Sequence, residues 1–228
     1  MEKKGILNAV SLKEQVYDYL RYQMKKGKIR PGSVINMDAT SKKLGVSKTP
    51  LRDALIQLEM EGFVKILPRR GVIVNALTIE DIKDYYQILG ALENTAIISA
   101  SSYIKEADVK KMEKLNESMK SALKRDDFNS YYERNLRFHD VYISLSGNGV
   151  LKKTVDVLKK RLYDFPRKAG YIREWEEASV LEHQRLIDLL AGKNFKEAAD
   201  FIRDVHWSFS VQEKFIKKYY SVKMESGS

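Results

Sequence analysis

The stretch GVSKTPLRDALIQLEMEGFVKILPRRGVIVN, residues Gly45 to Asn75, decides the fold of the N-terminal third. Its apolar residues recur at helical spacing and predict a short helix with one buried face: Leu51, Ala54, Leu55 and Leu58. Polar residues at the start of this helix lie off the apolar stripe: Lys48, Thr49 and Arg52. Two short β-type runs, FVKIL and VIVN, flank the corner Pro68–Gly71, which predicts a hairpin with a basic tip.

Helix signals also precede this stretch. A capping-box pattern that begins at Ser11 predicts a helix over residues 12–26. A second short helix is expected over residues 39–44 with Gly45 as its C-terminal cap, and Ser47 can cap the third helix. Three short helices followed by a β-hairpin is the element order of a winged helix-turn-helix.

This arrangement indicates DNA binding. An α-helix fits the major groove of DNA, and residues near its N-terminus reach the base edges, as Lys48, Thr49 and Arg52 would. Arginines at the hairpin corner, Arg69 and Arg70, can meet phosphates or the neighbouring minor groove. We therefore expect double-stranded DNA as a partner.

The charge distribution agrees with a DNA-binding domain in the N-terminal third of the chain. Residues 1–76 hold 15 Lys/Arg against 7 Asp/Glu, and the remaining residues hold 26 against 24. Nearly all of the net charge of +10 therefore lies in the first third, as in a polyanion-binding domain joined to a neutral one. The alternative is that the basic residues serve only solubility.

Composition narrows the class of protein further. The chain has no cysteine, which excludes disulfides, thiolate zinc sites and thiol catalysis. No apolar run approaches the roughly 18 residues that a membrane span needs. The N-terminus lacks the apolar core and cleavage site of a signal peptide. We expect a cytoplasmic protein without a membrane partner.

Beyond the hairpin the sequence becomes helical. A capping pattern at Thr78 begins this part, and from there to Tyr220 almost every segment has helical periodicity. No segment is a convincing strand, which predicts an antiparallel all-α bundle. The expected fold is therefore mainly α, with a winged helix-turn-helix over residues 1–76 and an all-helical domain over residues 77–228.

The three histidines of the chain all lie in the helical part. His139, His183 and His206 each fall on the apolar stripe of a different predicted helix. Burying an imidazole without a hydrogen-bond partner costs about 1–3 kcal/mol. One interpretation is three unrelated core histidines, each bonded to something nearby. The other is convergence on one divalent cation, to which Asn135, one turn before His139, could add an oxygen ligand.

Residues Lys28 to Asn75 closely resemble the N-terminal domain of GntR-family bacterial transcription regulators. The shared pattern is PGS, then GVS-basic-TP-x-R-x-AL-x-x-L-x-x-EG, then a wing with RG-x-x-V. More loosely, residues 78–220 resemble the FadR-type, or FCD, effector domain, through NLRFHDVYISLSGN, the EH at 182–183 and His206. This resemblance implies a homodimer that binds a palindromic operator and responds to a small-molecule effector with a carboxylate.

The resemblance also implies site residues. Family positions that contact DNA from the recognition helix and the wing match Ser47, Lys48, Thr49, Arg52, Arg69, Arg70 and Gly71. Metal-binding members use histidines that match His139, His183 and His206, with an aspartate four residues before the first. This chain has Asn135 there, a neutral and weaker ligand. The expected cofactor is a divalent transition metal, zinc first, with nickel or manganese as alternatives.

Two further departures concern the effector and the DNA. Many relatives carry an arginine, four residues before the position of Glu93, that grips the carboxylate of the effector. This chain has Leu89 there, so either another cation, such as Arg134 or Arg161, holds the carboxylate, or the effector differs. Asp38 stands where some relatives place a DNA-contacting arginine.

Two other functions stay open at this stage. A metal-dependent hydrolase could use the three-histidine site. Against it, no H-E-x-x-H motif accompanies the histidines, and Asn135 cannot act as a general base. An architectural DNA-binding protein whose bundle only dimerises is the other possibility. It predicts no metal and no response to small molecules.

Overall fold

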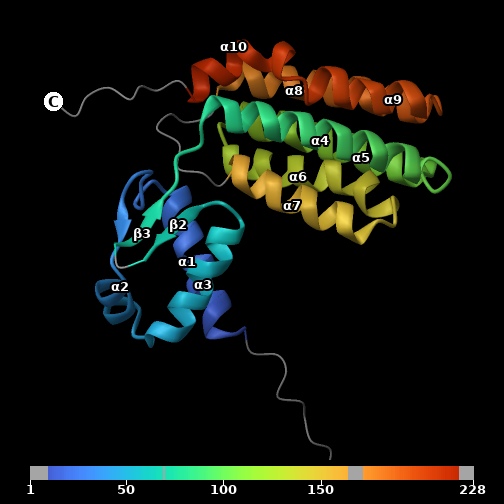
Figure 1. The fold of residues 1–228 in the computed structure, drawn as a ribbon. Helices are drawn as coiled ribbons and strands as arrows, with labels where there is room; N and C mark the ends of the chain where they lie inside the picture. The colour runs from blue at the N-terminus through green and yellow to red at the C-terminus, as the bar shows by residue number, and fades with distance from the viewer. Residues whose placement is uncertain (1–9, 69, 164–171, 221–228) are drawn as a thin grey trace, which may run out of the picture. The chain divides into compact units, whose positions relative to one another are not determined.

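The computed structural model describes residues 10–68, 70–163 and 172–220. The expected fold class is confirmed, since helices dominate and the strands are confined to the N-terminal part (Figure 1). The chain divides into two compact units. The first comprises residues 1–77 and 160–168, and the second comprises residues 78–159 and 169–228.

The first unit contains helices α1 to α3 and strands β1 to β3. Their bounds are α1 Leu12–Lys25, β1 Val34–Ile35, α2 Met37–Leu44, α3 Lys48–Met60, β2 Val64–Leu67 and β3 Gly71–Val74. The strands pair antiparallel in the order β1–β3–β2, with Val64 opposite Val74 and Ile35 opposite Val72. This is the architecture of a winged helix-turn-helix, in which β2 and β3 form the wing (Figure 1).

The core of this unit buries one face of α3. The predicted stripe of α3 is buried at Leu51, Ala54, Leu55 and Leu58 and packs with residues of α1 and the sheet. Burial of one face of an amphipathic helix leaves its opposite face in solvent. Gly45 ends α2 in the left-handed conformation, with φ of +65°, as predicted. Ser47 occupies the N-cap position of α3, but its side chain makes no capping hydrogen bond, contrary to our expectation.

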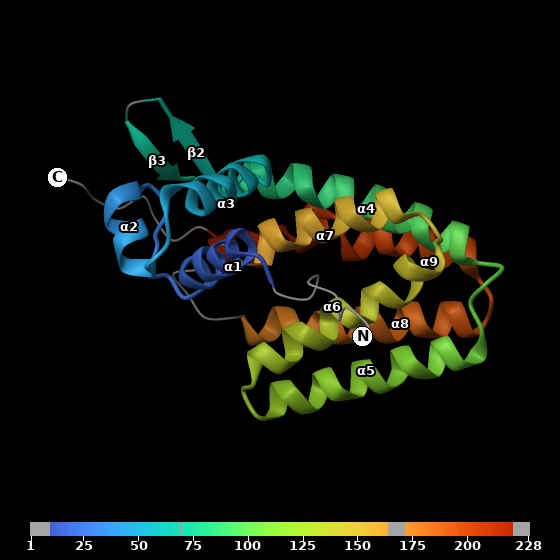
Figure 2. The ribbon, with the colours of Figure 1, turned by 90° about the horizontal axis from the view of Figure 1, so that it is seen from below.

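The described part of the second unit is helical. Its elements are α4 Ile79–Ala100, α5 Glu106–Lys124, α6 Phe128–Leu145, α7 Gly149–Tyr163, α8 Arg173–Ala191, α9 Phe195–Phe201, the π-helical turn η1 Ile202–His206 and α10 Phe209–Tyr220. The last four residues of α7 are grouped with the first unit. Helix α5 packs against α6 and α8 (Figure 2), and α4 packs against α6, α9 and η1.

Two local features of the second unit position its candidate site. The capping box between Thr78 and Asp81 fixes the start of α4, as predicted. At Gly90 of α4, an added Cβ would lie 3.3 Å from the Cα of Arg203 and 3.3 Å from the Cβ of Trp207, so only glycine fits without displacement. This close approach brings η1 against α4. No helix in the described part of the chain is long and apolar enough to cross a membrane.

Candidate functional site

The imidazoles of His139, His183 and His206 converge inside the second unit. They come from α6, α8 and η1, and their candidate ligand atoms all lie within 4.8 Å of one another. The ring centroids are 5.2 Å apart for His139 and His183, and 5.0 Å apart for the other two pairs. All three side chains are at least 92% buried. The interpretation as three unrelated core histidines is therefore excluded.

The backbone of η1 sets the place of His206. A π-helical turn contains one extra residue compared with an α-helical turn, which rotates the residues that follow it. His206 is the last residue of this turn, and Trp207 follows it. Such turns occur frequently at functional sites.

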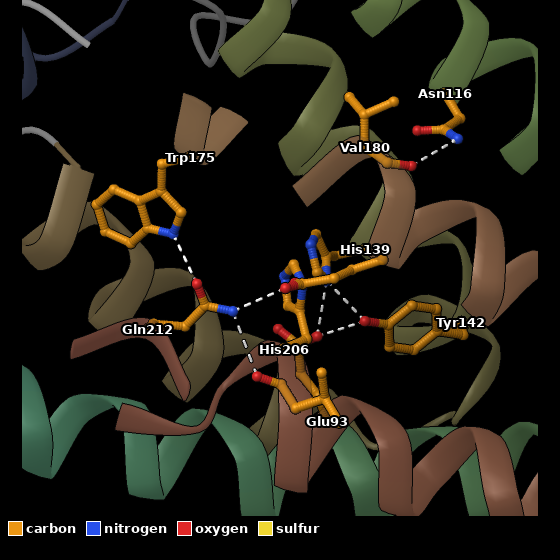
Figure 3. A network of polar contacts seen from close by, with 10 residues as sticks. Glu93, Asn116, His139, Tyr142, Trp175, Val180, His206 and Gln212 are labelled. Carbon is orange, nitrogen blue, oxygen red and sulfur yellow. Dashed lines mark hydrogen bonds and ion pairs between the residues drawn. The ribbon is translucent and has the colours of Figure 1, made fainter. Parts of the chain in front are cut away.

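His139 is held by a buried network on α4 and α6. Its Nδ1 lies 2.8 Å from Oε2 of Glu93 and 2.7 Å from the hydroxyl of Tyr142, which itself donates to Glu93 (Figure 3). Because an ionised carboxylate only accepts hydrogen bonds, Nδ1 carries the ring proton. Nε2 of His139 is consequently a free lone-pair donor, and it has no partner among the described residues.

His206 is oriented in the same way from α8. Its Nδ1 lies 2.8 Å from Oε2 of Glu182, while the amide of Gln212 donates to Oε1 of Glu182 at 2.8 Å. Gln212 in turn accepts a 2.9 Å hydrogen bond from the indole nitrogen of Trp175 (Figure 3). Nε2 of His206 is therefore the lone-pair nitrogen. A histidine that donates its other N–H to a carboxylate is typical of metal ligands.

Two more buried side chains, His183 and Asn135, have polar atoms without partners in the described part of the chain. Neither ring nitrogen of His183 is hydrogen-bonded within the described residues, and the same holds for the buried Oδ1 of Asn135. Asn135 lies one turn before His139 on α6 and is 5% exposed. An unpartnered buried polar atom costs about 1–3 kcal/mol, so a group that satisfies several of them at once is favoured.

The protonation states suit a cation. Burial lowers the pKa of His139 to about 3, against the opposing carboxylate of Glu93, and burial also holds the pKa of His183 well below its usual value. Both rings are therefore neutral near pH 7. Burial acts to raise the pKa of Glu93, but His139 and Lys159 outweigh it, so the pKa of Glu93 lies well below its ordinary value.

The donor set fits a divalent transition metal. The three imidazoles would form an N₃ set, to which the unpartnered amide oxygen of Asn135 would add a fourth ligand, and nitrogen and oxygen ligands of this kind suit zinc as well as nickel or manganese. The carboxylates of Glu93 and Glu182 orient two of the rings from behind.

Sequence analysis did not identify Lys159, the lysine whose side chain pairs with this network. Nζ of Lys159 on α7 forms an ion pair with Oε1 of Glu93 at 2.7 Å, and the lysine is only 4% exposed. Burial lowers the pKa of Lys159, and Glu93 opposes that shift. In the sequence, Lys159 stands within the basic run LKKR and has the appearance of a solvated surface residue. Its burial and its ion pair with Glu93 are evident only from the packed structure.

The two arginines that we considered as effector ligands, Arg134 and Arg161, make other contacts in the structure. Arg134 donates a 2.8 Å hydrogen bond to the backbone carbonyl of Ser130 on its own helix. Arg161 lies in the part of α7 that is grouped with the first unit, where its guanidinium is 5.3 Å from the ring centroid of Phe63. A role for either arginine in effector binding stays a prediction.

The predicted DNA-contacting residues of the first unit lie on its surface. Ser47, Lys48, Thr49 and Arg52 are exposed at the start of α3, and Arg70 is exposed beside Gly71 in the wing. Arg69 falls outside the described residues. Lys48 forms an ion pair with Asp38, at the start of α2, which the sequence did not predict. The surface is thus basic, with one acidic residue beside its leading lysine.

Comparison with known families decides the class of the protein. Residues 12–74 match the bacterial regulatory proteins of the gntR family, and residues 84–205 match the FCD domain. The chain belongs to the gntR family of bacterial regulators and carries an FCD domain. Members of this family are transcription regulators and not enzymes. The hydrolase alternative is therefore dropped for this gntR-family regulator.

Relatives and solved structures agree with this assignment. An uncharacterised HTH-type transcriptional regulator of Bacillus subtilis, YdhC, is 29% identical over 81% of this chain and 83% of its own length. The gluconate operon transcriptional repressor of the same species is 25% identical over 90% of this chain and 85% of its length.

Solved structures share the fold at lower identity. A GntR regulator from Rhodococcus sp. RHA1 has a TM-score of 0.69 at 17% identity, covering 94% of this chain and all of its own. E. coli McbR/YncC has a TM-score of 0.68 at 20% identity, covering 92% of this chain and 97% of its own.

Proposed function

We propose that this gntR-family regulator is a homodimer that binds a palindromic operator and senses a small organic acid at a divalent metal centre, zinc in the first place. The ligands of the metal would be Asn135, His139, His183 and His206. The observation that carries the proposal is the convergence of three histidines at one point with orphaned buried atoms, Nε2 of His139 and both nitrogens of His183, while Oδ1 of Asn135, one turn before His139, is orphaned as well.

The first unit supplies the DNA contacts in this proposal. Ser47, Lys48, Thr49 and Arg52 would enter the major groove with α3, and the wing residues Arg69, Arg70 and Gly71 would meet the backbone. Arginine and lysine suit O6 and N7 of guanine, and each good pairing contributes about 1–3 kcal/mol of discrimination. Because phosphate neutralisation provides much of the affinity, binding should weaken steeply with salt. An operator as target would place the protein in the cytoplasm.

The helical unit would hold the acid beside the metal. A bound divalent metal supplies a Lewis-acidic position that attracts a carboxylate oxygen. Glu93 and Glu182 keep the rings of His139 and His206 in the tautomer that presents Nε2. The burial of the cluster excludes water and so strengthens electrostatic interactions there.

Regulation requires that the acid favour one arrangement of the DNA-binding units over another. Helix α4 carries Glu93, and four residues, 75–78, separate its start from the end of β3 of the wing. A change in the position of α4 would move the end of this short connection to the wing. We propose this continuity as the route of coupling.

A homodimer follows from the proposed target. A palindromic operator presents two equal half-sites, which a two-fold symmetric dimer matches. Apolar side chains of α4 are exposed in the single chain: Ile88 is 43% exposed and Ile98 is 42% exposed. A second copy that covers this part of α4 would bury them.

Operator selection from the genomic DNA of the source organism, followed by fluorescence anisotropy, tests the proposal. Zinc should co-purify at about one ion per chain, and one or more acids in a panel should shift the operator affinity of the zinc-loaded protein. Arg52→Ala should abolish operator preference, whereas the matched Arg137→Ala on the exposed face of α6 should not. An unchanged footprint of Arg52→Ala on the operator would reject the proposed DNA contacts. Full zinc content after replacement of both His139 and His206 would reject the proposed metal centre.

A further inference from the structure

The helical unit buries more hydrogen-bond donors than its own acceptors satisfy. Lys159 is 4% exposed and Trp207 is 2% exposed. The indole Nε1 of Trp207 has no partner among the described residues. Nζ of Lys159 has its ion pair with Glu93 but no well-directed hydrogen bond to any described residue. These donors are not explained by the metal, because a cation attracts lone pairs and repels N–H groups.

Glu93 cannot satisfy the lysine alone. An ammonium group carries three N–H donors. Oε2 of Glu93 already receives hydrogen bonds from His139 and Tyr142, and only Oε1 faces Lys159. Two N–H groups of Lys159 and one of Trp207 therefore need acceptors from outside the described side chains.

The unsatisfied donors border the histidine cluster. Nζ of Lys159 lies 5.4 Å from the ring centroid of Trp207. The ring of Trp207 lies 5.2 Å from that of His206 and 5.9 Å from that of His139. Lys159 and Trp207 thus lie beside the cluster, on the side of the Trp207 ring. An acid held at the histidines would satisfy them with a second acceptor group.

The charge balance specifies an anion. Lys159 and Glu93 neutralise each other in their ion pair, and imidazoles that bind a metal do so in the neutral form. Because residue 135 is asparagine, Glu182 is the carboxylate left near the cluster to offset a divalent cation. With the proposed metal bound, the site would have excess positive charge together with unused donors, and a carboxylate supplies both negative charge and up to about four acceptor positions.

We infer that Lys159 and Trp207 bind the second acidic group of a small dicarboxylate whose first carboxylate lies at the histidine cluster. This inference rests on the proposed metal centre and specifies its ligand. It also assigns the anchoring role, expected of an arginine from the sequence, to Lys159. Arg134 is less suited, because its guanidinium already donates to the carbonyl of Ser130.

Isothermal titration of the zinc-loaded full chain with matched pairs of acids provides the test. Each pair has the same number of carbons: malonate with propionate, succinate with butyrate, and glutarate with valerate. In at least one pair the dicarboxylate should bind about tenfold or more tightly, since a hydrogen bond to a charged group has this magnitude.

Trp207→Phe isolates the indole N–H while keeping an aromatic ring. This variant should lose about tenfold in affinity for the preferred dicarboxylate, with its zinc content and its binding of the monocarboxylate unchanged. Trp175→Phe is the matched control, because the Nε1 of Trp175 already donates to Gln212 at 2.9 Å. It should bind both acids as the unmodified chain does. Lys159→Met should lose more affinity than Trp207→Phe, and its zinc content serves as the check that it is folded.

The outcomes separate this inference from the proposed function. If the chain takes up zinc but prefers neither acid of any pair, or if Trp207→Phe binds the dicarboxylate as tightly as the unmodified chain, the inference is overturned and the metal centre stands. If the unmodified chain takes up no zinc, the proposed metal centre fails, and the inference fails with it.

Discussion

Replacing Gly90 by alanine should weaken metal binding more than it weakens the fold. The added Cβ would lie 3.3 Å from both the Cα of Arg203 and the Cβ of Trp207, and 3.4 Å from the carbonyl oxygen of Arg203. Ordinary carbon–carbon contacts are about 3.5–4.0 Å, so η1 has to move by a few tenths of an ångström. His206 belongs to this same π-helical turn.

The substitution Gly90→Ala has two opposing effects on the free energy of unfolding, which nearly cancel, whereas its effect on zinc affinity is not offset. Overpacking of this kind costs about 1–3 kcal/mol, while alanine gains about 1 kcal/mol over glycine inside a helix. The net loss of stability is therefore about 0–2 kcal/mol. Displacing His206 from its hydrogen bond with Glu182 should lower zinc affinity by about 10- to 100-fold, as losses of orienting partners do.

Competition with a chromophoric chelator measures the zinc affinity, and thermal unfolding of the zinc-free protein measures the fold. Gly149→Ala is the matched control, because an added Cβ at the start of α7 meets no atom within 4 Å. It should leave zinc affinity unchanged. Equal zinc affinity in both variants would show that the contact at Gly90 does not position His206, and the reasoning would be refuted.

Three further outcomes follow from the same structure. Asn135→Asp should raise zinc affinity by at least tenfold in the chelator assay and destabilise the zinc-free protein, because the buried Oδ1 then carries charge; weaker zinc binding would contradict this. Asp38→Asn should tighten binding to random-sequence duplexes several-fold by anisotropy, since it frees Lys48 and removes a negative charge from the DNA-facing surface, whereas Asp18→Asn on α1 should not. The zinc-free protein should lose stability as pH falls from about 6.5 towards 3, because the unfolded chain binds a proton that the folded state, with the pKa of His139 lowered to about 3, does not. Urea unfolding in the presence of a chelator measures this loss: the free energy of unfolding should fall by about 1.4 kcal/mol per pH unit because of His139. A free energy of unfolding that is constant or rises towards acidic pH would contradict the prediction.

Local signals predicted the first unit well. The capping box at Ser11 fixed the start of α1, and the observed end at Lys25 differs from the expected one by a single residue. The wing strands followed from their alternating apolar pattern. Strand β1 was missed, because two residues carry no periodicity and Val34–Ile35 becomes a strand only by pairing with β3. The expected start of α2 at residue 39 was two residues late, since Asn36 and not a later residue caps it.

The site was only partly accessible from the sequence. Helical periodicity placed each histidine on an inward face, but it could not show that the three faces meet. Glu93 contacts His139 across 46 residues of sequence, and no local pattern encodes such a pair. The π-helical turn that places His206 depends on the close approach of η1 to Gly90, which is a tertiary constraint. Lys159 has the sequence environment of a surface lysine and is buried only because α7 turns it inward.

X-ray absorption at the zinc edge of the purified full chain tests the central claim most directly. The account predicts a zinc ion with imidazole scattering from three histidines at about 2.0–2.1 Å and an oxygen ligand in the same shell, and a loss of one imidazole in His183→Ala. A spectrum with no bound zinc, or with a ligand shell that His183→Ala leaves unchanged, would contradict it.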